Sequence, residues 1–211
     1  LSNMPASLPS LIQAVNDTVN NNADEIAELD RAIGDGDHVI NLQRGIAALQ
    51  ALESELVTLD WSQAFMKIGM TLMSTMGGAS GSLFGTLFLS MAKAAKDQEL
   101  NIVTFSTIFS QGVEAVKQRG KADIGEKTML DTLIPVANRL KEDSANGTDL
   151  DRLLNNLSEQ AIAGMASTKN MIATKGRASF LGERAIGHID AGARTSQLMI
   201  CAMTQALAQQ T

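Results

Sequence analysis

Apolar residues recur at helical spacing along almost the whole chain, and this pattern leaves little room for a sheet. The first run has the spacing of one helix face, with Leu8, Leu11, Ile12, Val15 and Val19. Residues that favour strands are scarce, because aromatic residues make up only 3% of the chain and tyrosine is absent. Alanine, leucine and methionine, which favour helices, are frequent. We therefore predict an all-α fold.

The periodicity predicts eight helices joined by short connections. The expected helices cover residues 8–30, a stretch from 38 to about 52, 61–74, a stretch from 82 to about 91, 103–119, 128–141, 150–165 and 192–208. Pro135 falls inside the sixth and should kink it, because proline has no N–H to donate. The chain has no internal repeat or linker, so residues 1–211 are expected to form a single domain. Leu1 is an unusual first residue, which suggests that an initiator methionine has been removed.

Short connections between successive helices favour antiparallel neighbours in an up-and-down arrangement. The first, third, fifth and seventh connections then emerge at one end, at residues 34–38, 75–81, 120–127 and 175–192. The others, near 53–60, 96–101 and 142–149, are polar loops that contain a single glycine. Since a rigid scaffold gathers functional loops, we predict the active site at the glycine-rich end.

Charge and hydropathy argue against several classes of function. A net charge of −6 disfavours a nucleic-acid partner, which would require a clustered basic face. No apolar run reaches the length of a membrane span, and the start of the chain lacks a secretory pattern. The lone Cys201 excludes an internal disulfide and suits a reducing compartment. We expect a cytoplasmic protein without a membrane partner.

Three carboxylates, on Asp30, Asp35 and Asp37, surround a glycine-hinged turn that leads directly into a helix. Mg²⁺ prefers oxygen ligands and often shares its coordination sphere with phosphate, and a helix N-terminus offers free N–H groups to phosphate oxygens. In the alternative interpretation, Asp37 caps the helix and the other two are solvated. An EF-hand fails, because its fifth and twelfth positions would be Val39 and Ile46. We predict a divalent metal site.

Two further connections are rich in glycine. In the first, Met76–Gly85, glycines would let the backbone approach an anion, and Ser80 or Ser82 would cap the next helix. The alternative is a tight turn between helices. In the second, Arg119–Met129, the side chain of Met129 would face a purine ring or would simply belong to the core.

The longest connection, Lys175–Gly192, has the length of a lid or binding loop. Arg177 would stabilise charge on a transferred phosphoryl group, and Asp190 would cap the last helix or contact a ribose. His188 is a candidate proton carrier, although a structural role is the better interpretation. Glu183 and its neighbour Arg184 are expected to form a solvated charge pair.

With these elements in order, the chain resembles the nucleotide-binding L subunits of bacterial dihydroxyacetone kinases. The matching stretches are spread over the chain: Leu29–Arg44 (LDRAIGDGDHVINLQR), Gly69–Gly85 (GMTLMSTMGGASGSLFG), Arg119–Asp131 (RGKADIGEKTMLD) and Lys175–Gly192 (KGRASFLGERAIGHIDAG). The chain departs from the family pattern at Val39, where the family often has glycine, and at Ala191, which replaces a common proline.

The resemblance implies a closed up-and-down barrel of eight antiparallel helices, forming one nucleotide-binding L domain with ADP and two Mg²⁺ ions at one rim. It implies that Asp30, Asp35 and Asp37 bind the metal and that Arg177 is catalytic. The resemblance also implies contacts to the nucleotide. The phosphates would be contacted by His38, Val39, Ile40, Asn41, Ala79 and Ser80, and the adenine by Gly120 and Met129. Four residues would close over the nucleotide: Arg177, Asp190, Ala191 and Gly192.

A free-standing chain of this length has no room for the larger part that holds dihydroxyacetone, so it looks like the phosphotransferase-system form. That form implies that bound ADP accepts a phosphoryl group from a phosphohistidine on an M subunit. The ATP formed transiently then passes the group to dihydroxyacetone on a K subunit.

Three alternatives remain open. The first is a subunit that uses exchangeable ATP directly, and the second is a noncatalytic nucleotide and metal sensor that controls a transcriptional regulator. The third is a fatty-acid-kinase-like domain, which the Asp35-Gly-Asp-His38 sequence fits less well.

Overall fold

The computed structural model describes residues 5–210, and this part of the chain is helical and contains no strand. The expectation for Leu1 lies outside the described residues. The long α-helices are α1 (Leu8–Asn21), α2 (Ala23–Ile33), α3 (His38–Gln50), α5 (Trp61–Thr75), α6 (Gly78–Ala95), α7 (Ile102–Gly120), α8 (Leu130–Ala145), α9 (Leu150–Ser167) and α10 (Ala191–Ala208). The short elements are α4 (Glu53–Leu56) and the 3-10 helices η1 (Thr168–Asn170) and η2 (Arg177–Ala185). The predicted all-α class is confirmed.

Two predicted helix boundaries were wrong. The first predicted helix, 8–30, is divided into α1 and α2 at Asn22, whose side-chain amide donates to the Thr18 carbonyl at 2.8 Å. Asparagine favours such local bonds over the helix interior, and three asparagines stand together here. The helix expected after Gly81 begins at Gly78, because the small residues 78–81 fit a first turn packed against the Met76 carbonyl.

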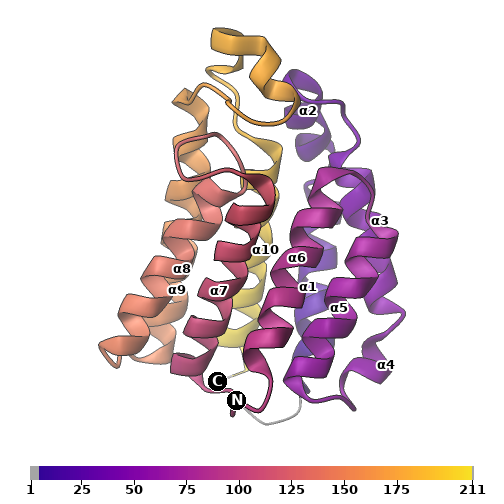
Figure 1. The fold of residues 1–211 in the computed structure, drawn as a ribbon, viewed down its shortest axis with the longest axis vertical. Coiled ribbons are helices and arrows are strands. Elements are labelled where there is room, and N and C mark those ends of the chain that lie inside the picture. Colours follow the sequence, from indigo (N-terminus) through magenta and orange to yellow (C-terminus); the bar gives the residue numbers. More distant parts are fainter. Residues whose placement is uncertain (1–4, 211) are drawn as a thin grey trace.

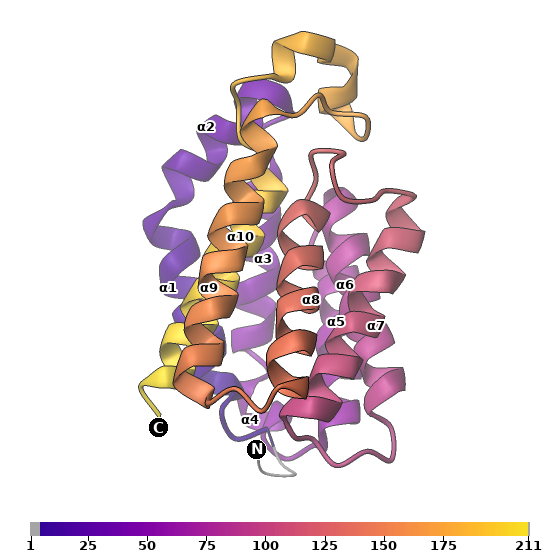
Figure 2. The ribbon, with the colours of Figure 1, turned by 90° about the vertical axis from the view of Figure 1, so that its left-hand side faces the viewer.

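Successive connections alternate between the two ends of the molecule, as predicted. The long helices run up and down its long axis, with α1 and α2 together in place of the one expected helix (Figure 1). Residues 34–37, 76–77, 121–129 and 168–190 lie at the upper end, which we call the rim (Figure 2). Short polar connections lie at the opposite end, where α10 ends.

Neighbouring helices pack in chain order, and the last long helix returns to the first. α10 packs against both α9 and α1, and α1 packs in turn against α3. Buried aliphatic side chains from the long helices form one continuous core. A separate small cluster near the rim joins Ile33 of α2 to Ala173 and Ala185 of the 168–190 connection. The scaffold therefore holds the rim connections on a packed base.

The helices α5 and α7 begin at the end opposite the rim, and each begins with a capping box. Asp60 and Gln63 cap α5, and Asn101 and Thr104 cap α7. Such reciprocal bonds satisfy free N–H groups and define where a helix starts. α8 continues through Pro135 from Leu130 to Ala145. Within residues 5–210, no helix is long and apolar enough to cross a membrane.

Candidate functional site

Three carboxylates meet at the rim, as the sequence predicted. Asp30 lies in the last turn of α2, and Asp35 and Asp37 lie in the turn that leads to α3. One carboxylate oxygen from each lies within 4.8 Å of those of the other two. Gly36 has a φ of +81°, a left-handed conformation that glycine adopts readily and that lets the turn fold back. We call these three residues the acidic trio.

The acidic trio has the chemistry of a site for a hard divalent cation. All three donors are oxygens, and the side chains range from half-buried to exposed, so water can complete the coordination sphere. Asp37 occupies the N-cap position of α3, yet its side chain makes no capping bond. Asp30 accepts a hydrogen bond from the backbone N–H of His38 at 3.0 Å. These contacts contradict the interpretation in which Asp37 caps the helix and Asp30 is merely solvated.

His38 connects three helices beneath the acidic trio. Its imidazole is buried, and Nδ1 lies 3.0 Å from the Ser80 hydroxyl of α6 while Nε2 lies 2.9 Å from the Thr195 hydroxyl of α10. Burial lowers the pKa of His38, and the charges of Asp30, Asp37 and Asp35 oppose that shift. A neutral ring with both nitrogens engaged fixes the start of α3 relative to α6 and α10. A contact between His38 and phosphate stays a prediction.

The first turns of α3 and α6 lie side by side at the rim, because His38 is bonded to Ser80. Ala79 is exposed in the first turn of α6. The expected caps were wrong: Ser80 and Ser82 both lie inside α6, and the Ser82 hydroxyl instead accepts from Arg119 Nε at 3.2 Å. The first-turn N–H groups of both helices have no partner within their own helix, which suits an anion.

The other residues of α3 that were expected to contact the phosphates differ in how far they are buried. Val39 and Asn41 are buried, whereas Ile40 is 57% exposed. The Asn41 side chain lies against the backbone of Gly77, where a Cβ would come within 2.8 Å of its amide oxygen. The two predicted phosphate-binding segments are therefore in direct contact at this point.

Met129 and Gly120, the predicted borders of an adenine site, are in different surroundings. Met129 is 5% exposed and belongs to the core, although it also lies against Gly192, as a Cβ there would be 3.6 Å from the Met129 Cβ. Gly120 is the last residue of α7. The structure thus brings the predicted residues at 129 and 192 together.

The connection 175–192, predicted as a lid, belongs to the longer segment between α9 and α10. We call residues 169–187 of that segment the lid, and it reaches the acidic trio. Arg177 Nε contacts Asp35 Oδ2 at 2.9 Å, and the Arg177 side chain is 72% exposed. Glu183 and Arg184 are exposed, and the described residues include no ion pair between them. η2 also contacts α2. The residue predicted to stabilise a phosphoryl group therefore lies at the acidic trio.

The lid leads into α10 through Asp190, whose carboxylate accepts from the Ala193 N–H at 2.8 Å and caps the helix. The capping role was one of the two predicted for this residue. Burial raises the pKa of Asp190 to about 6, opposed by the hydrogen bond from Ala193. Ala191 and Gly192 form the first turn of α10. His188 contributes its backbone carbonyl, which accepts from Lys127.

Sequence reasoning missed two charged residues at the rim, Lys127 and Asp131. Lys127 is 2% exposed and Asp131 is 1% exposed. Asp131 accepts from the Gly125 N–H at 2.6 Å and from the Thr128 N–H at 2.8 Å, so it fixes the turn before α8. Both residues stand in the stretch Arg119–Asp131 that carried the family resemblance, so a signal was present in the sequence.

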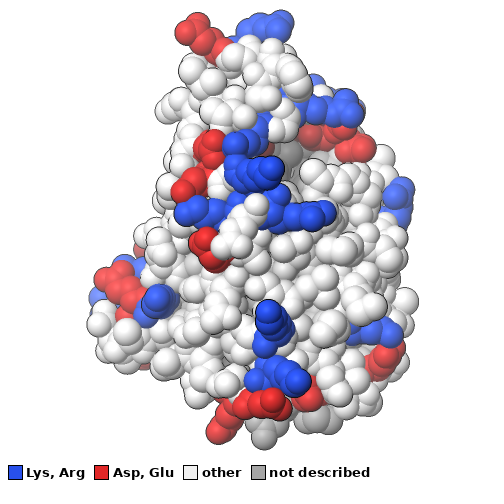
Figure 3. Space-filling model, viewed as in Figure 1, with Lys and Arg blue, Asp and Glu red and all other residues white. Residues whose placement is uncertain are grey.

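Basic side chains also gather near the rim, around the upper end of α7 (Figure 3), where the sequence places Lys117, Arg119 and Lys121. Lys117 forms an ion pair with Asp123 at 2.8 Å.

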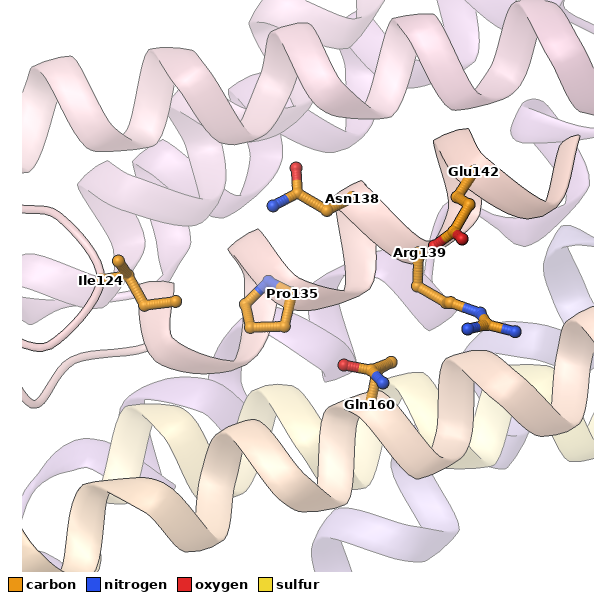
Figure 4. Close-up of a pocket in the computed structure, with 6 residues that line it drawn as sticks. All are labelled: Ile124, Pro135, Asn138, Arg139, Glu142 and Gln160. Carbon is orange, nitrogen blue, oxygen red and sulfur yellow. The ribbon is translucent and has the colours of Figure 1, made fainter. Parts of the chain in front are cut away.

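A shallow pocket of about 300 Å³ lies along α8 (Figure 4). Pro135, Arg139 and Gln160 are among its lining residues, and none of the predicted site residues is. The rim and this pocket are therefore different features.

The sequence model of the DAK2 domain family matches residues 32–205. The chain is 41% identical over 187 residues to the "PEP-dependent dihydroxyacetone kinase 1, ADP-binding subunit DhaL" of Listeria innocua, covering 89% of each chain. It is 41% identical over 194 residues to the "PTS-dependent dihydroxyacetone kinase, ADP-binding subunit DhaL" of Lactococcus lactis, covering 92% of this chain and 93% of the relative. It is 38% identical over 185 residues to the corresponding Escherichia coli "PEP-dependent" subunit, covering 87% and 88%.

Solved structures share the fold. The native dihydroxyacetone kinase of C. freundii superposes with a TM-score of 0.75 at 22% identity, covering 98% of this chain and 34% of that chain. The same kinase in complex with AMP-PNP and Mg²⁺ gives a TM-score of 0.72 at 23% identity, covering 96% and 33%. The chain thus spans about a third of the length of that kinase.

Proposed function

We propose, from the premise that this chain belongs to the DAK2 domain family, that it is the ADP-binding subunit of a phosphoenolpyruvate-dependent dihydroxyacetone kinase. The observation that carries the proposal is the acidic trio, whose oxygens lie within 4.8 Å beside the first turns of α3 and α6. Relatives with the ADP-binding name match almost the whole chain, which supports the same assignment.

In this proposal Asp30, Asp35 and Asp37 would hold Mg²⁺, and the ion would offset the negative charge of the phosphates. Residues 38–41 at the start of α3 and 79–80 of α6 orient the phosphates. In α3 the N–H groups of Val39 and Ile40 would serve, because the His38 N–H donates to Asp30 and the Asn41 N–H to the Asp37 carbonyl. The chain supplies no nucleophile, because phosphoryl transfer requires mainly positioning and charge stabilisation. Residues 120 and 129 border the base, and residues 190–192 close the site from the side of α10.

The finer parts of the proposal concern the donor and the partners. We propose that two Mg²⁺ ions and one ADP stay bound, that a phosphohistidine on an M subunit phosphorylates the ADP, and that a K subunit presents dihydroxyacetone. A transcriptional regulator is a further proposed partner, and the cytoplasm is the proposed compartment. The return of α10 to α1 supports a closed barrel of eight antiparallel helices as the scaffold.

Reconstitution tests the donor. The purified chain is combined with candidate K and M subunits, phosphoenolpyruvate and the general phosphotransferase proteins, and dihydroxyacetone phosphate is measured. We expect product without added ATP, and we expect absorbance at 260 nm to stay with the protein through gel filtration. Product that requires a stoichiometric supply of ATP would indicate an exchangeable donor, and nucleotide-dependent complexes without labelled sugar would indicate a sensor.

Arg177→Ala tests the lid residue. Its guanidinium is at the acidic trio and mostly exposed, so we expect it to contact phosphate mainly during transfer. The variant should lower turnover by about tenfold or more while the dissociation constant for Mg·ADP changes by less than about threefold. Arg184→Ala is the matched control, since Arg184 is an exposed arginine of the same lid. Equal turnover in Arg177→Ala and wild type would exclude a catalytic role for Arg177.

A further inference from the structure

Lys127 is a charged residue in an unusual position. Its side chain is 2% exposed. Its backbone adopts a φ of +61°, a conformation that residues with a Cβ rarely accept. A non-glycine residue stays in this region only when its surroundings hold it there. Those surroundings are the two ends of the lid.

The ammonium group of Lys127 joins the two ends of the lid to one point. Its Nζ donates to the Thr168 carbonyl at 2.5 Å and to the His188 carbonyl at 2.5 Å. Two more bonds cross the same place, from the Gly187 N–H to the Lys169 carbonyl at 2.7 Å and from the Asp190 N–H to the Thr168 hydroxyl at 3.1 Å. We call these four contacts the lid neck.

The charge of this ammonium is met mainly by carbonyl dipoles. Burial lowers the pKa of Lys127, while the nearby carboxylates of Asp190 and Asp131 oppose that shift. No carboxylate lies within ion-pair distance of its Nζ among residues 5–210. Removing the ammonium would leave the Thr168 and His188 carbonyls without this donor at a poorly hydrated site, which is costly. Two of the four neck contacts therefore depend on this one side chain.

We propose that Lys127 is a positioning residue that fixes the lid neck and thereby sets where Arg177 and residues 190–192 stand at the site. This inference rests on the proposed function. The lid has a second support on α2, through Ile33 packed against Ala173 and Ala185. With the neck held by Lys127 and the lid body resting on α2, Arg177 reaches the acidic trio.

Hydrogen exchange of the metal-free and nucleotide-free protein tests the neck directly. In Lys127→Met, the amides of Gly187 and Asp190 should exchange at least about tenfold faster than in wild type, because their bonds form part of the neck. Amides in the middle of α3 and α6 should keep their protection. Lys121→Met is the matched control, because Lys121 stands in the same connection, also has a positive φ of 48°, and is exposed.

Rescue separates positioning from general destabilisation. Lys127→Ala leaves space for propylammonium, which should restore part of the protection at Gly187 and part of the turnover, whereas neutral propanol should not. In Lys127→Met we expect turnover to fall about tenfold while the dissociation constant for Mg·ADP changes by less than about threefold. If Lys127→Met does not fold, Lys127→Gln, whose amide can still donate to one carbonyl, takes its place.

If the amides of Gly187 and Asp190 exchange in Lys127→Met as slowly as in wild type, the proposal is overturned. An equal loss of protection throughout the core would also overturn it. The proposed function fails differently. Wild type that does not bind Mg·ADP would reject that function, while exchange at the neck would still report on Lys127.

Discussion

The aspartates at the rim differ in what their carboxylates contact, and Asp30 accepts a hydrogen bond from the His38 N–H. Asp131 and Asp190 accept hydrogen bonds from backbone N–H groups and fix the starts of α8 and α10. Among the described residues, the carboxylates of Asp35 and Asp37 accept no hydrogen bond from a backbone N–H. Asp35 forms an ion pair with the exposed side chain of Arg177. Oxygens with free lone pairs are available to a cation, so the acidic trio is where single substitutions should change metal binding.

Asp35→Asn should weaken binding of Mg²⁺ and of Mg·ADP, because an amide oxygen carries no charge. We expect a loss of at least about tenfold, which corresponds to about 1.4 kcal/mol, with an unchanged helical circular dichroism spectrum. Titration calorimetry measures the affinity. Asp151→Asn, an exposed change in α9, serves as the control. Unaltered affinity in Asp35→Asn would remove Asp35 from the set of ligands.

Asp190 should give the protein a distinctive dependence of stability on pH. Its folded-state pKa is raised to about 6 by burial, whereas an unfolded chain has a value of about 3.9. Between these values the folded state holds a proton that the unfolded state has lost. The stability that this group contributes is therefore complete below about pH 4 and is lost as pH rises through about 6, by roughly 2–3 kcal/mol.

Asp190→Asn keeps a side chain that can cap α10 but does not titrate. The free energy of unfolding of wild type, relative to this variant, should therefore be higher near pH 4 than near pH 7.5. Urea unfolding at several pH values measures the difference in the free energy of unfolding between the two proteins. The contributions of the other titrating groups cancel in this difference, because both proteins contain them. A difference that stays constant over this range would contradict the raised pKa.

At the scale of elements, the contact between α8 and α9 determines how the third and fourth rim connections meet. Pro135 has no N–H, so the Asp131 carbonyl lacks the donor that an α-helix would normally supply four residues later. That carbonyl lies against Gly164 of α9, where a Cβ would be 2.2 Å away. The two helices can approach this closely only because α9 has no side chain at this position.

Gly164→Ala should therefore destabilise the protein despite the higher helix propensity of alanine. The added methyl would meet backbone atoms of Asp131 and Thr132, so we expect the free energy of unfolding to fall by about 1–3 kcal/mol. Chemical denaturation measures the change. Gly120→Ala adds the same methyl where the nearest atom is 3.6 Å away and should be close to neutral. Equal stability of the two variants would show that α8 and α9 can move apart.

At the scale of the whole molecule, the rim is assembled from segments that are far apart in the sequence. His38 contacts Thr195 across 157 positions of the chain, and Lys127 contacts His188 across 61. Such a site exists only when the helices are packed together. A ligand that binds it must therefore stabilise the folded state over the unfolded one.

Mg²⁺ and ADP together should raise the melting temperature. At a concentration of about 100 times the dissociation constant, the stabilisation is about 2.7 kcal/mol, which for a chain of this size corresponds to roughly 5–10 °C. ADP with a chelator should give a much smaller shift if, as we propose, the acidic trio holds the metal that binds the phosphates. A full shift with ADP alone would contradict that dependence. Thermal denaturation followed by circular dichroism makes the measurement.

Some of these features could be predicted from the sequence, because they depend on residues that are close together in the chain. Helical periodicity predicted the all-α class. The alternation of successive connections between two ends predicted that the glycine-rich connections gather at the rim. The acidic trio was predictable since Asp30, Asp35 and Asp37 are only a turn apart. The break at Asn22 and the early start of α6 were not predicted, because local hydrogen bonds and packing against Met76 determine them.

The sequence by itself determined the all-α class, the up-and-down order of the helices and the cluster of three carboxylates, since short-range periodicity and spacing encode all three. Only the tertiary structure decided which side chains are buried and what they contact. Lys127 appears as an ordinary loop lysine in the sequence, and its burial between two carbonyls follows from the way the last connection folds back over α8. Contacts across such sequence distances depend on packing of the whole chain, which no local pattern records.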